Sequence, residues 1–235
     1  MASTVIKNWD NKTWLSSKDY IKSFNKFLLK QIKLDRGSKI LDIGCGRGKI
    51  IGNLSSKLML INKPLGIDLT LHKDKDKRIK FKKVNALTFL LKNKKKFDLI
   101  LIKQTIHLFS FKEITKLLNL SKKNLKKGGK IIILSLDTEK NELPTFKLMK
   151  IKLKQSLKRD KKILKLITKL HPYKKTRFNF DVKILKNKYL KMLQQRYIST
   201  LLPMTNSQIQ KGSDEIKYKY KSYIKFKDKL ICLTL

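Results

Sequence analysis

Three glycines, Gly44, Gly46 and Gly48, stand within five residues in the stretch "ILDIGCGRGKI", just behind an apolar run that carries Asp42. Bare backbone of this kind can approach a ligand closely, and the helix expected to follow offers N–H groups to an anion such as a carboxylate. A dinucleotide-binding turn would need a further glycine where Lys49 stands. The carboxylate of Asp42 instead suits a ligand with a cationic end, which a pyrophosphate lacks. We therefore expect this turn to bind a ligand other than a dinucleotide.

A second group of polar side chains follows a later apolar run, "FDLILIK". Gln104, Thr105 and His107 come directly after it, and we expect the first two to contact a bound ligand. A neutral imidazole is suited to accepting a proton near pH 7, so His107 is the candidate catalytic base. The alternative is that His107 packs within its turn and only holds the backbone. His72 and His171 lie in basic, loop-like stretches and receive no role.

These residues need a scaffold that brings the ends of separate strands together. Behind a serine cap, apolar residues at helical spacing in "SSKDYIKSFNKFLLKQIK" predict a first helix, and a second is expected over Lys49–Leu58. Short apolar runs, separated by helical or loop segments, predict strands. They are Lys39–Ile43, Leu65–Ile67, Ile79–Val84, Asp98–Ile102 and Lys130–Ser135. Strands that alternate with helices indicate an α/β fold with a doubly wound, mostly parallel, Rossmann-like sheet.

The end of the chain departs from this alternation. "YKYKSYIKFKDKLICLTL" alternates polar and apolar residues, and its short link at 227–229 predicts an antiparallel hairpin that closes one edge of the sheet. Residues 141–195 are Lys-rich and are expected to be largely helical, as an insertion that caps a site. We expect one domain, because no linker or internal repeat divides the chain. Its parts are an N-terminal helical segment (1–36), a ligand-binding core (37–136), a helical cap (137–195) and a C-terminal segment with the hairpin (196–235).

The composition excludes several classes of protein. An apolar fraction of 41% in 235 residues fits one folded core. Because no uncharged apolar run is long enough for a membrane span and the start lacks a secretory-signal pattern, we expect a cytosolic protein. The two cysteines form no C-x-x-C pair, so neither a disulfide framework nor a metal site is indicated.

The formal net charge of +41 would ordinarily indicate a nucleic-acid partner. Nearly all of the basic residues are Lys, however, and Ile, Asn and Lys abound while Ala occurs only twice. That skew favours A/T-rich codons and needs no selection for binding to a polyanion. A nucleic-acid groove usually mixes Arg and exposed aromatic side chains with its lysines. We therefore interpret the lysines as solvated surface and keep nucleic-acid binding as the alternative.

The motifs together resemble those of the class I S-adenosylmethionine-dependent methyltransferases, and in detail the small-molecule "type 11" group. "ILDIGCGRG" resembles the first motif of that family, an acid followed by G-x-G-x-G. The stretches "LGIDL", "FKKVNAL", "FDLILIKQTIHLF" and "LKKGGKIIIL" keep step with the motifs that follow, so the resemblance covers about residues 39–136. It implies a Rossmann-like fold, S-adenosylmethionine as cofactor and S-adenosylhomocysteine as product.

The resemblance also implies a cofactor-binding set. Its members are Asp42, Gly44, Gly46, Gly48, Asp68, Asn85, Ala86 and Gln104. Asp42 is expected near the methionine ammonium or the loop itself, and Asp68 on the ribose hydroxyls. Asn85 stands where the family usually has an aspartate beside the adenine. We expect its side-chain oxygen to contact the adenine amino group.

In this superfamily the N-terminal helices and the inserts after the fourth and fifth strands commonly form the acceptor pocket. This implies substrate-binding candidates in two aromatic stretches, "WDNKTWLSSKDYI" and "RYISTLLPM". They are Trp9, Trp14, Tyr20, Arg196 and Tyr197. The fork-shaped guanidinium of Arg196 suits an acceptor carboxylate. The alternative for each of these residues is plain core packing.

These observations predict an enzyme that moves a methyl group from S-adenosylmethionine to an oxygen, nitrogen or sulfur atom of a small-molecule acceptor. Methyl transfer is an in-line displacement, so the protein mainly supplies alignment, and a base helps only when the acceptor must lose a proton. One alternative is an RNA methyltransferase that uses "KDKDKRIKFKK" and the insertion as a basic track. Another is a non-catalytic relative that binds a ligand or partner through the same fold.

Overall fold

The computed structural model describes residues 13–235. They form a seven-stranded sheet in the order β3-β2-β1-β4-β5-β7-β6, in which β1 to β5 are parallel and β7 is antiparallel to both of its neighbours. The chain winds outwards from β1 to β3 and then returns to place β4 on the other side of β1. Ligands of doubly wound sheets bind at the carboxyl ends of the strands, at such a reversal. The predicted fold, mostly parallel with an antiparallel C-terminal edge, is confirmed.

Most elements lie close to where the sequence predicts them. The strands are β1 (Ile40–Ile43), β2 (Leu65–Asp68), β3 (Lys80–Lys83), β4 (Phe97–Lys103), β5 (Leu125–Leu136), β6 (Lys174–Leu185) and β7 (Tyr223–Thr234). The α-helices are α1 (Lys18–Leu29), α2 (Lys49–Leu58), α3 (Ala86–Lys92), α4 (Phe111–Lys123), α5 (Lys147–Leu170), α6 (Lys186–Gln194) and α7 (Asn206–Lys219). Short 3₁₀ turns lie at η1 (Trp14–Ser16), η2 (Ile106–Leu108) and η3 (Ser199–Leu201).

Side-chain caps explain where two of these helices begin. The Ser17 hydroxyl accepts a hydrogen bond from the N–H of Tyr20, which confirms the serine cap predicted for the first helix. At α4, the N–H of Glu113 donates to the Ser110 hydroxyl, and the N–H of Ser110 donates to the Glu113 carboxylate. This reciprocal pair fixes the chain just after η2, the turn that carries His107.

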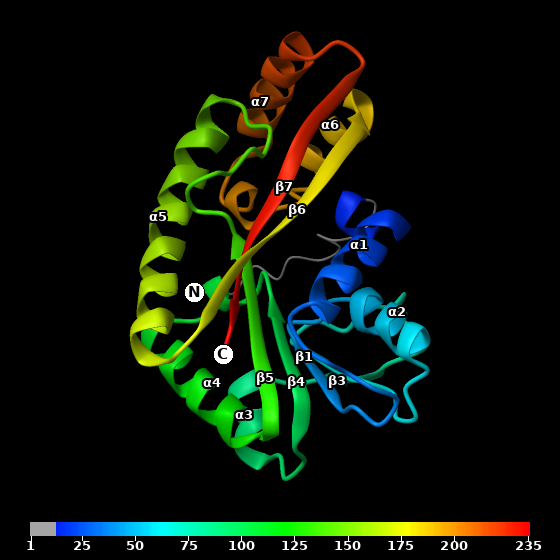
Figure 1. The fold of residues 1–235 in the computed structure, drawn as a ribbon. Helices are drawn as coiled ribbons and strands as arrows, with labels where there is room; N and C mark the ends of the chain where they lie inside the picture. Colours follow the sequence, from blue (N-terminus) through cyan, green and yellow to red (C-terminus); the bar gives the residue numbers. More distant parts are fainter. Residues whose placement is uncertain (1–12) are drawn as a thin grey trace.

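Helices cover both faces of the sheet. In Figure 1, α1 and α2 lie on one side of it, while α3, α4 and the long helix α5 lie on the other. Each face has its own apolar core: Phe24 and Leu54 belong to the first, and Leu118 and Ile163 to the second. Strands β6 and β7 continue beyond β5 as a long arm with α6 and α7 beside it (Figure 1).

The pairing at the end of the chain differs from the prediction. Strand β7 runs unbroken through 227–229, where the sequence predicts a turn, because Asp228 is buried and accepts a hydrogen bond from Trp14 Nε1 at 3.0 Å. Its antiparallel partner is β6, which lies inside the segment predicted to be largely helical. The apolar residues of β6 recur at every second position, a strand signal that the surrounding lysines obscure. They are Phe178, Phe180, Val182 and Ile184.

The insertion therefore consists of a helix, a strand and a helix, and not of helices alone. The helix α5 has 24 residues, and its buried apolar side chains belong to the apolar cores. The strand β6 extends the sheet. Within residues 13–235, none of the helices combines the length and the apolar character that a membrane span requires.

Candidate functional site

The glycine turn closes the carboxyl end of β1. Gly44, Gly46 and Gly48 have φ values of +72°, +53° and +67°, in the left-handed region that favours glycine. A Cβ atom at Gly44 would lie 2.3 Å from Oγ1 of Thr105, so no side chain fits between this turn and the end of β4. Gly48 begins α2 without a side-chain cap, which leaves the N–H groups of the first helical turn to a ligand or solvent.

Asp68, at the end of β2, holds the glycine turn in place. Its carboxylate accepts hydrogen bonds from the N–H groups of Gly46 at 2.8 Å and Thr70 at 2.9 Å. A carboxylate has about four acceptor positions, so Asp68 keeps capacity for a ligand. Arg47 in the turn pairs with Asp74 at 2.6 Å and ties the β2–β3 loop to it. The carboxyl ends of β1 and β2 are thus joined by side-chain bonds.

Asn85 follows β3 and caps α3. Its side-chain oxygen accepts hydrogen bonds from the N–H groups of Leu87 at 2.9 Å and Thr88 at 3.2 Å. This corrects the expectation that the oxygen would contact an adenine amino group, because the oxygen is used by the helix. The amide nitrogen is the group that Asn85 has left for a ligand. Ala86 is buried beside it.

The end of β4 combines a strained backbone with a buried charge. Gln104 has a φ of +53°, which costs a non-glycine residue roughly 1–2 kcal/mol. Lys103 is only 8% exposed, and its ammonium donates to the side-chain oxygen of Gln104 at 2.8 Å. The same ammonium lies 5.4 and 5.5 Å from the ring centres of Tyr20 and Phe24. Backbone strain of this kind concentrates at ligand sites.

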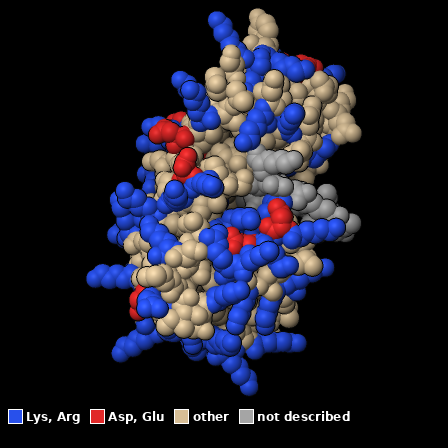
Figure 2. Space-filling view, turned by 90° about the vertical axis from the view of Figure 1, so that its right-hand side faces the viewer, with Lys and Arg blue, Asp and Glu red and all other residues tan. Residues whose placement is uncertain are grey.

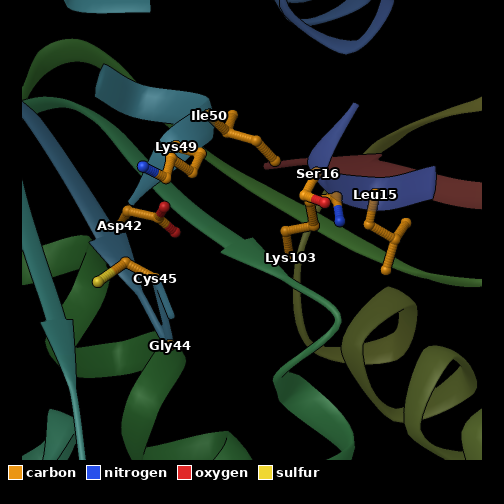
Figure 3. A pocket seen from close by; sticks show the side chains of 8 residues that line it. All are labelled: Leu15, Ser16, Asp42, Gly44, Cys45, Lys49, Ile50 and Lys103. Atoms are coloured by element: carbon orange, nitrogen blue, oxygen red, sulfur yellow. The ribbon is translucent and has the colours of Figure 1, made fainter. Parts of the chain in front are cut away.

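A small pocket lies beside the glycine turn. Figure 3 shows Asp42 and Lys49 on one side of it, and Lys103 and Leu15 on the other. Burial raises the pKa of Asp42 to about 7, while the charge of Lys103 opposes the rise and the charge of Asp68 adds to it. Asp42 therefore changes its charge near neutral pH, and a cationic ligand group would favour the carboxylate.

A larger cavity of about 460 Å³ adjoins this pocket, and the two share Leu15 and Gly44 in their walls. The ends of β1, β2 and β4 contribute to its lining, together with Asn85, η2, part of α5 and the segment around η3. One ligand can therefore extend from the small pocket past Gly44 into the larger cavity. Asp68 and Asn85 line the larger cavity, as do residues of α5 and of the segment around η3.

His107 lies in η2 and lines the larger cavity. Burial, with a contribution from the charge of Arg159, lowers the pKa of its imidazole to about 4. The side chain is therefore neutral at pH 7 and can accept a hydrogen bond or, as a weak base, a proton. Arg159 of α5 donates to the backbone oxygens of His107 at 2.5 Å and Phe109 at 2.8 Å. The insertion thus holds the turn that carries the candidate base.

Trp14 and Tyr197, two of the substrate-binding candidates, line the larger cavity. Their rings pack edge to face with centres 5.5 Å apart. The carboxylate of Asp228, from the middle of β7, accepts from the Trp14 indole and also lines the cavity. The N-terminal segment, the segment before η3 and the last strand therefore meet at one wall of the cavity.

The structure places Tyr20 and Arg196 away from the cavity wall, although both are substrate-binding candidates by sequence. Tyr20 is fully buried in the core. The Arg196 guanidinium donates to the backbone oxygen of Met204 at 3.0 Å and to Asn206 Oδ1 at 2.8 Å, so it holds the segment before α7. Trp9 lies outside the described residues.

Several charged or titratable side chains of the two pockets have no role predicted from the sequence, among them Lys103, His72, Asp160 and Asp228. A lysine carries little signal in this chain, and His72 lies in a basic stretch although its side chain is buried. Acidic residues are scarce, with 17 Asp and Glu against 58 Lys and Arg. That scarcity is the signal that could have drawn attention to the two aspartates.

Comparisons with known proteins agree with this geometry. A family model described as a methyltransferase domain matches residues 34–197, which is well over half of the chain. A search of curated proteins found no match.

Solved structures of low sequence identity share the fold. A protein from Anabaena variabilis, described as a methyltransferase of an antibiotic biosynthesis pathway, has 16% identity and a TM-score of 0.62 over 90% of this chain and 96% of its own. A S-adenosylmethionine-dependent methyltransferase from Geobacter sulfurreducens, in complex with S-adenosylhomocysteine, has 13% identity and a TM-score of 0.53 over 92% of this chain and 90% of its own. The plantazolicin methyltransferase BamL, in complex with a triazolic desmethyl analogue and S-adenosylhomocysteine, has 19% identity and a TM-score of 0.53 over 96% and 87%.

The carboxylates and glycines at the strand ends thus stand on the fold that these methyltransferases use, and the family model spans them. The chain belongs to the methyltransferase domain family and is a class I S-adenosylmethionine-dependent methyltransferase.

Proposed function

We propose that the enzyme moves the methyl group to an oxygen, nitrogen or sulfur atom of a small-molecule acceptor held in the larger cavity. The observation that carries this proposal is the cavity itself, about 460 Å³ in volume and walled on one side by α5 and the segment around η3. A concave site of this size suits a small ligand. BamL, solved with a desmethyl acceptor analogue and S-adenosylhomocysteine together, is a precedent on the same fold.

The residues present fit both ends of the cofactor. Asp68 keeps acceptor positions for the ribose hydroxyls, and the Asn85 amide stands where the adenine is expected. Asp42 offers a carboxylate to the methionine ammonium, and the charge of Lys103 in the same pocket suits the methionine carboxylate. Gly44 has no side chain, so the ligand can approach the backbone closely where the two pockets meet. When bound, S-adenosylmethionine supplies a sulfonium methyl group that is open to attack by a nucleophile.

The protein contributes to the reaction by aligning the two reactants and by removing a proton. With S-adenosylmethionine held by Asp42 and Asp68, the acceptor atom would take the methyl group and S-adenosylhomocysteine would be left as the product. The proton that an O–H, N–H or S–H acceptor loses passes to the neutral imidazole of His107. Arg159 keeps this imidazole in place through the backbone of η2. A screen of small-molecule acceptors that follows release of S-adenosylhomocysteine tests the proposal, and release that no acceptor increases contradicts it.

S-adenosylmethionine should stabilise the fold, and NAD should not. At about 100 times the dissociation constant, a ligand that binds only the folded state contributes roughly 2.7 kcal/mol. For a chain of this size the gain is several degrees in melting temperature, which differential scanning fluorimetry measures. A rise in melting temperature with NAD and none with S-adenosylmethionine would contradict the assignment of the glycine turn to S-adenosylmethionine.

The affinity for S-adenosylhomocysteine should depend on pH through Asp42. With a pKa of about 7, this carboxyl is mostly protonated at pH 6 and mostly ionised at pH 8. Because the ionised form pairs with the methionine ammonium, binding should tighten by about tenfold between these pH values. Asp42→Asn should bind more weakly at pH 8 and lose most of this dependence, as measured by calorimetry. Equal pH dependence in both proteins would contradict the pairing.

Through Asp42, the stability of the unliganded fold should depend on pH in the opposite direction from ligand affinity. The pKa of Asp42 in the folded state lies above its unfolded value of 3.8, so the folded state holds the proton more tightly. Asp42 therefore favours the unliganded fold at low pH, and this contribution is lost as the pH rises from about 4 to 7. Asp42→Asn should gain in melting temperature relative to wild type over that range.

The structure offers little support for the RNA alternative. Figure 2 shows Lys and Arg spread over both the upper and lower parts of the face in view, rather than gathered in one stripe. In the stretch "KDKDKRIKFKK", Asp74 pairs with Arg47 and Asp76 with Arg78, so part of its charge is balanced within the protein. A track for a polyanion would leave such basic side chains for phosphates.

A further inference from the structure

The larger cavity differs in charge from the rest of the protein. The chain holds 58 Lys and Arg and only 17 Asp and Glu. Among the described residues that line the cavity, none is Lys or Arg and four are acids: Asp68, Glu113, Asp160 and Asp228. The excess of lysine in the whole sequence is thus not found among the described residues of this lining. The cavity therefore disfavours anionic ligands and favours cations.

Three of the four acids have partners within the protein. Asp68 accepts from the glycine turn and from Thr70. Glu113 accepts from the N–H of Ser110 in the capping box, and Asp228 accepts from the Trp14 indole. These hydrogen bonds explain the positions of the three carboxylates, and no ligand is needed to explain them.

The fourth acid, Asp160 on α5, has no such partner. It is 6% exposed, and its buried atom Oδ1 makes no hydrogen bond with any of the described residues. The neighbouring Arg159 is directed elsewhere, to the backbone oxygens of His107 and Phe109. Burial raises the pKa of Asp160 to about 6, with the charge of Arg159 opposing the rise, so the carboxyl is mostly ionised at pH 7.5. A buried carboxylate without a partner is destabilising, and a donor from a ligand would remove that penalty.

We propose that Asp160 binds a protonated amine of the methyl acceptor. This inference rests on the proposed function and narrows it to acceptors that carry a basic nitrogen. Asp160 and His107 line the same cavity, and Arg159 joins α5 to the turn that carries His107. A protonated amine has no lone pair for attack, so the group at Asp160 is an anchor. The methyl group goes to a second nucleophilic atom of the same molecule, which faces His107.

The test uses three probes of similar size that share a phenyl ring and differ in the end group: 2-phenylethylamine, 2-phenylethanol and phenylacetate. Binding of each is measured by calorimetry at pH 7.5 with the enzyme saturated in S-adenosylhomocysteine. The wild-type enzyme should bind the amine at least about tenfold more tightly than the carboxylate. Asp160→Asn should weaken binding of the amine by about tenfold or more and leave binding of the alcohol unchanged. Asp214→Asn, which removes an exposed acid paired with Lys217 on α7, is the matched control and should change neither.

Three outcomes overturn the inference: tighter binding of the carboxylate than of the amine, no binding of the amine, or unchanged binding of the amine by Asp160→Asn. The ranking of the probes by the wild-type enzyme tests it without any variant. Binding of S-adenosylhomocysteine is measured first, and its absence would count against the proposed function. Normal binding of S-adenosylhomocysteine without a preference for the amine would count against the role of Asp160 alone.

Discussion

His107→Ala should lower kcat by roughly 10²- to 10⁴-fold while the affinity for S-adenosylhomocysteine stays near that of the wild type. The imidazole lines the larger cavity, and the protein holds its turn through Arg159 and the Ser110–Glu113 capping box. Loss of the side chain therefore removes the proton acceptor and leaves the cofactor pocket intact. Single-turnover rates at saturating cofactor and acceptor measure the effect.

The pH dependence of the same reaction separates a base from a packing residue. Because burial and Arg159 lower the pKa of His107 to about 4, its imidazole stays neutral from pH 8 down to pH 6. An ordinary histidine, with a pKa near 6.5, would lose activity over that range. The wild-type rate should therefore show no fall due to His107 above pH 6, and the deficit of His107→Ala should shrink above the pKa of the acceptor. A deficit that does not vary with pH and comes with weaker binding would assign His107 to holding the loop.

Asp68→Ala should weaken S-adenosylmethionine binding by at least tenfold. Each hydrogen bond from a ribose hydroxyl to the carboxylate is worth about 1.5 to 3 kcal/mol. The variant also loses the bonds from Asp68 to Gly46 and Thr70, so the glycine turn loses a support at the same time. Calorimetry measures the affinity, and the melting temperature of the unliganded variant reports on the loss of that support.

Asp74→Ala provides a control for the loss of support to the glycine turn. It removes the pair with Arg47, which also supports the glycine turn, but Asp74 lies outside the lining of both pockets. If Asp68 acts on the ribose, Asp68→Ala should weaken binding far more than Asp74→Ala at a similar loss of stability. Equal losses of affinity would reduce the role of Asp68 to support of the turn.

The glycine turn could be predicted from the sequence because its backbone leaves a record in residue type. Positive φ angles favour glycine at Gly44, Gly46 and Gly48, and the close approach of Thr105 leaves no room for a Cβ atom at Gly44. The parallel core was predictable for a similar reason, since fully buried strands read as unbroken apolar runs. Both signals are local, and neither depends on a partner far away in the chain.

Features that depend on distant partners could not be predicted in the same way. Strand β6 exists because β7 pairs with it, and the Lys-rich sequence between its apolar positions hid that pairing. Asp228 reads as a turn residue until Trp14 is seen to donate to its buried carboxylate. Arg196 has the right chemistry for a carboxylate, but the backbone oxygen of Met204 lies within its reach and takes its hydrogen bond. Residue type gives the chemistry of a side chain and not its neighbours.

Methyl transfer to a mixture of possible acceptors tests the account most directly. The enzyme would be given S-adenosylmethionine labelled in its methyl group, together with total RNA and a pool of small molecules in amine, alcohol and carboxylate forms. The cavity and its acidic lining predict that the label enters the small-molecule fraction, first of all compounds with a basic nitrogen, and that His107→Ala abolishes most of it. Label that appears in RNA, at a rate that falls steeply with added salt, would contradict the account.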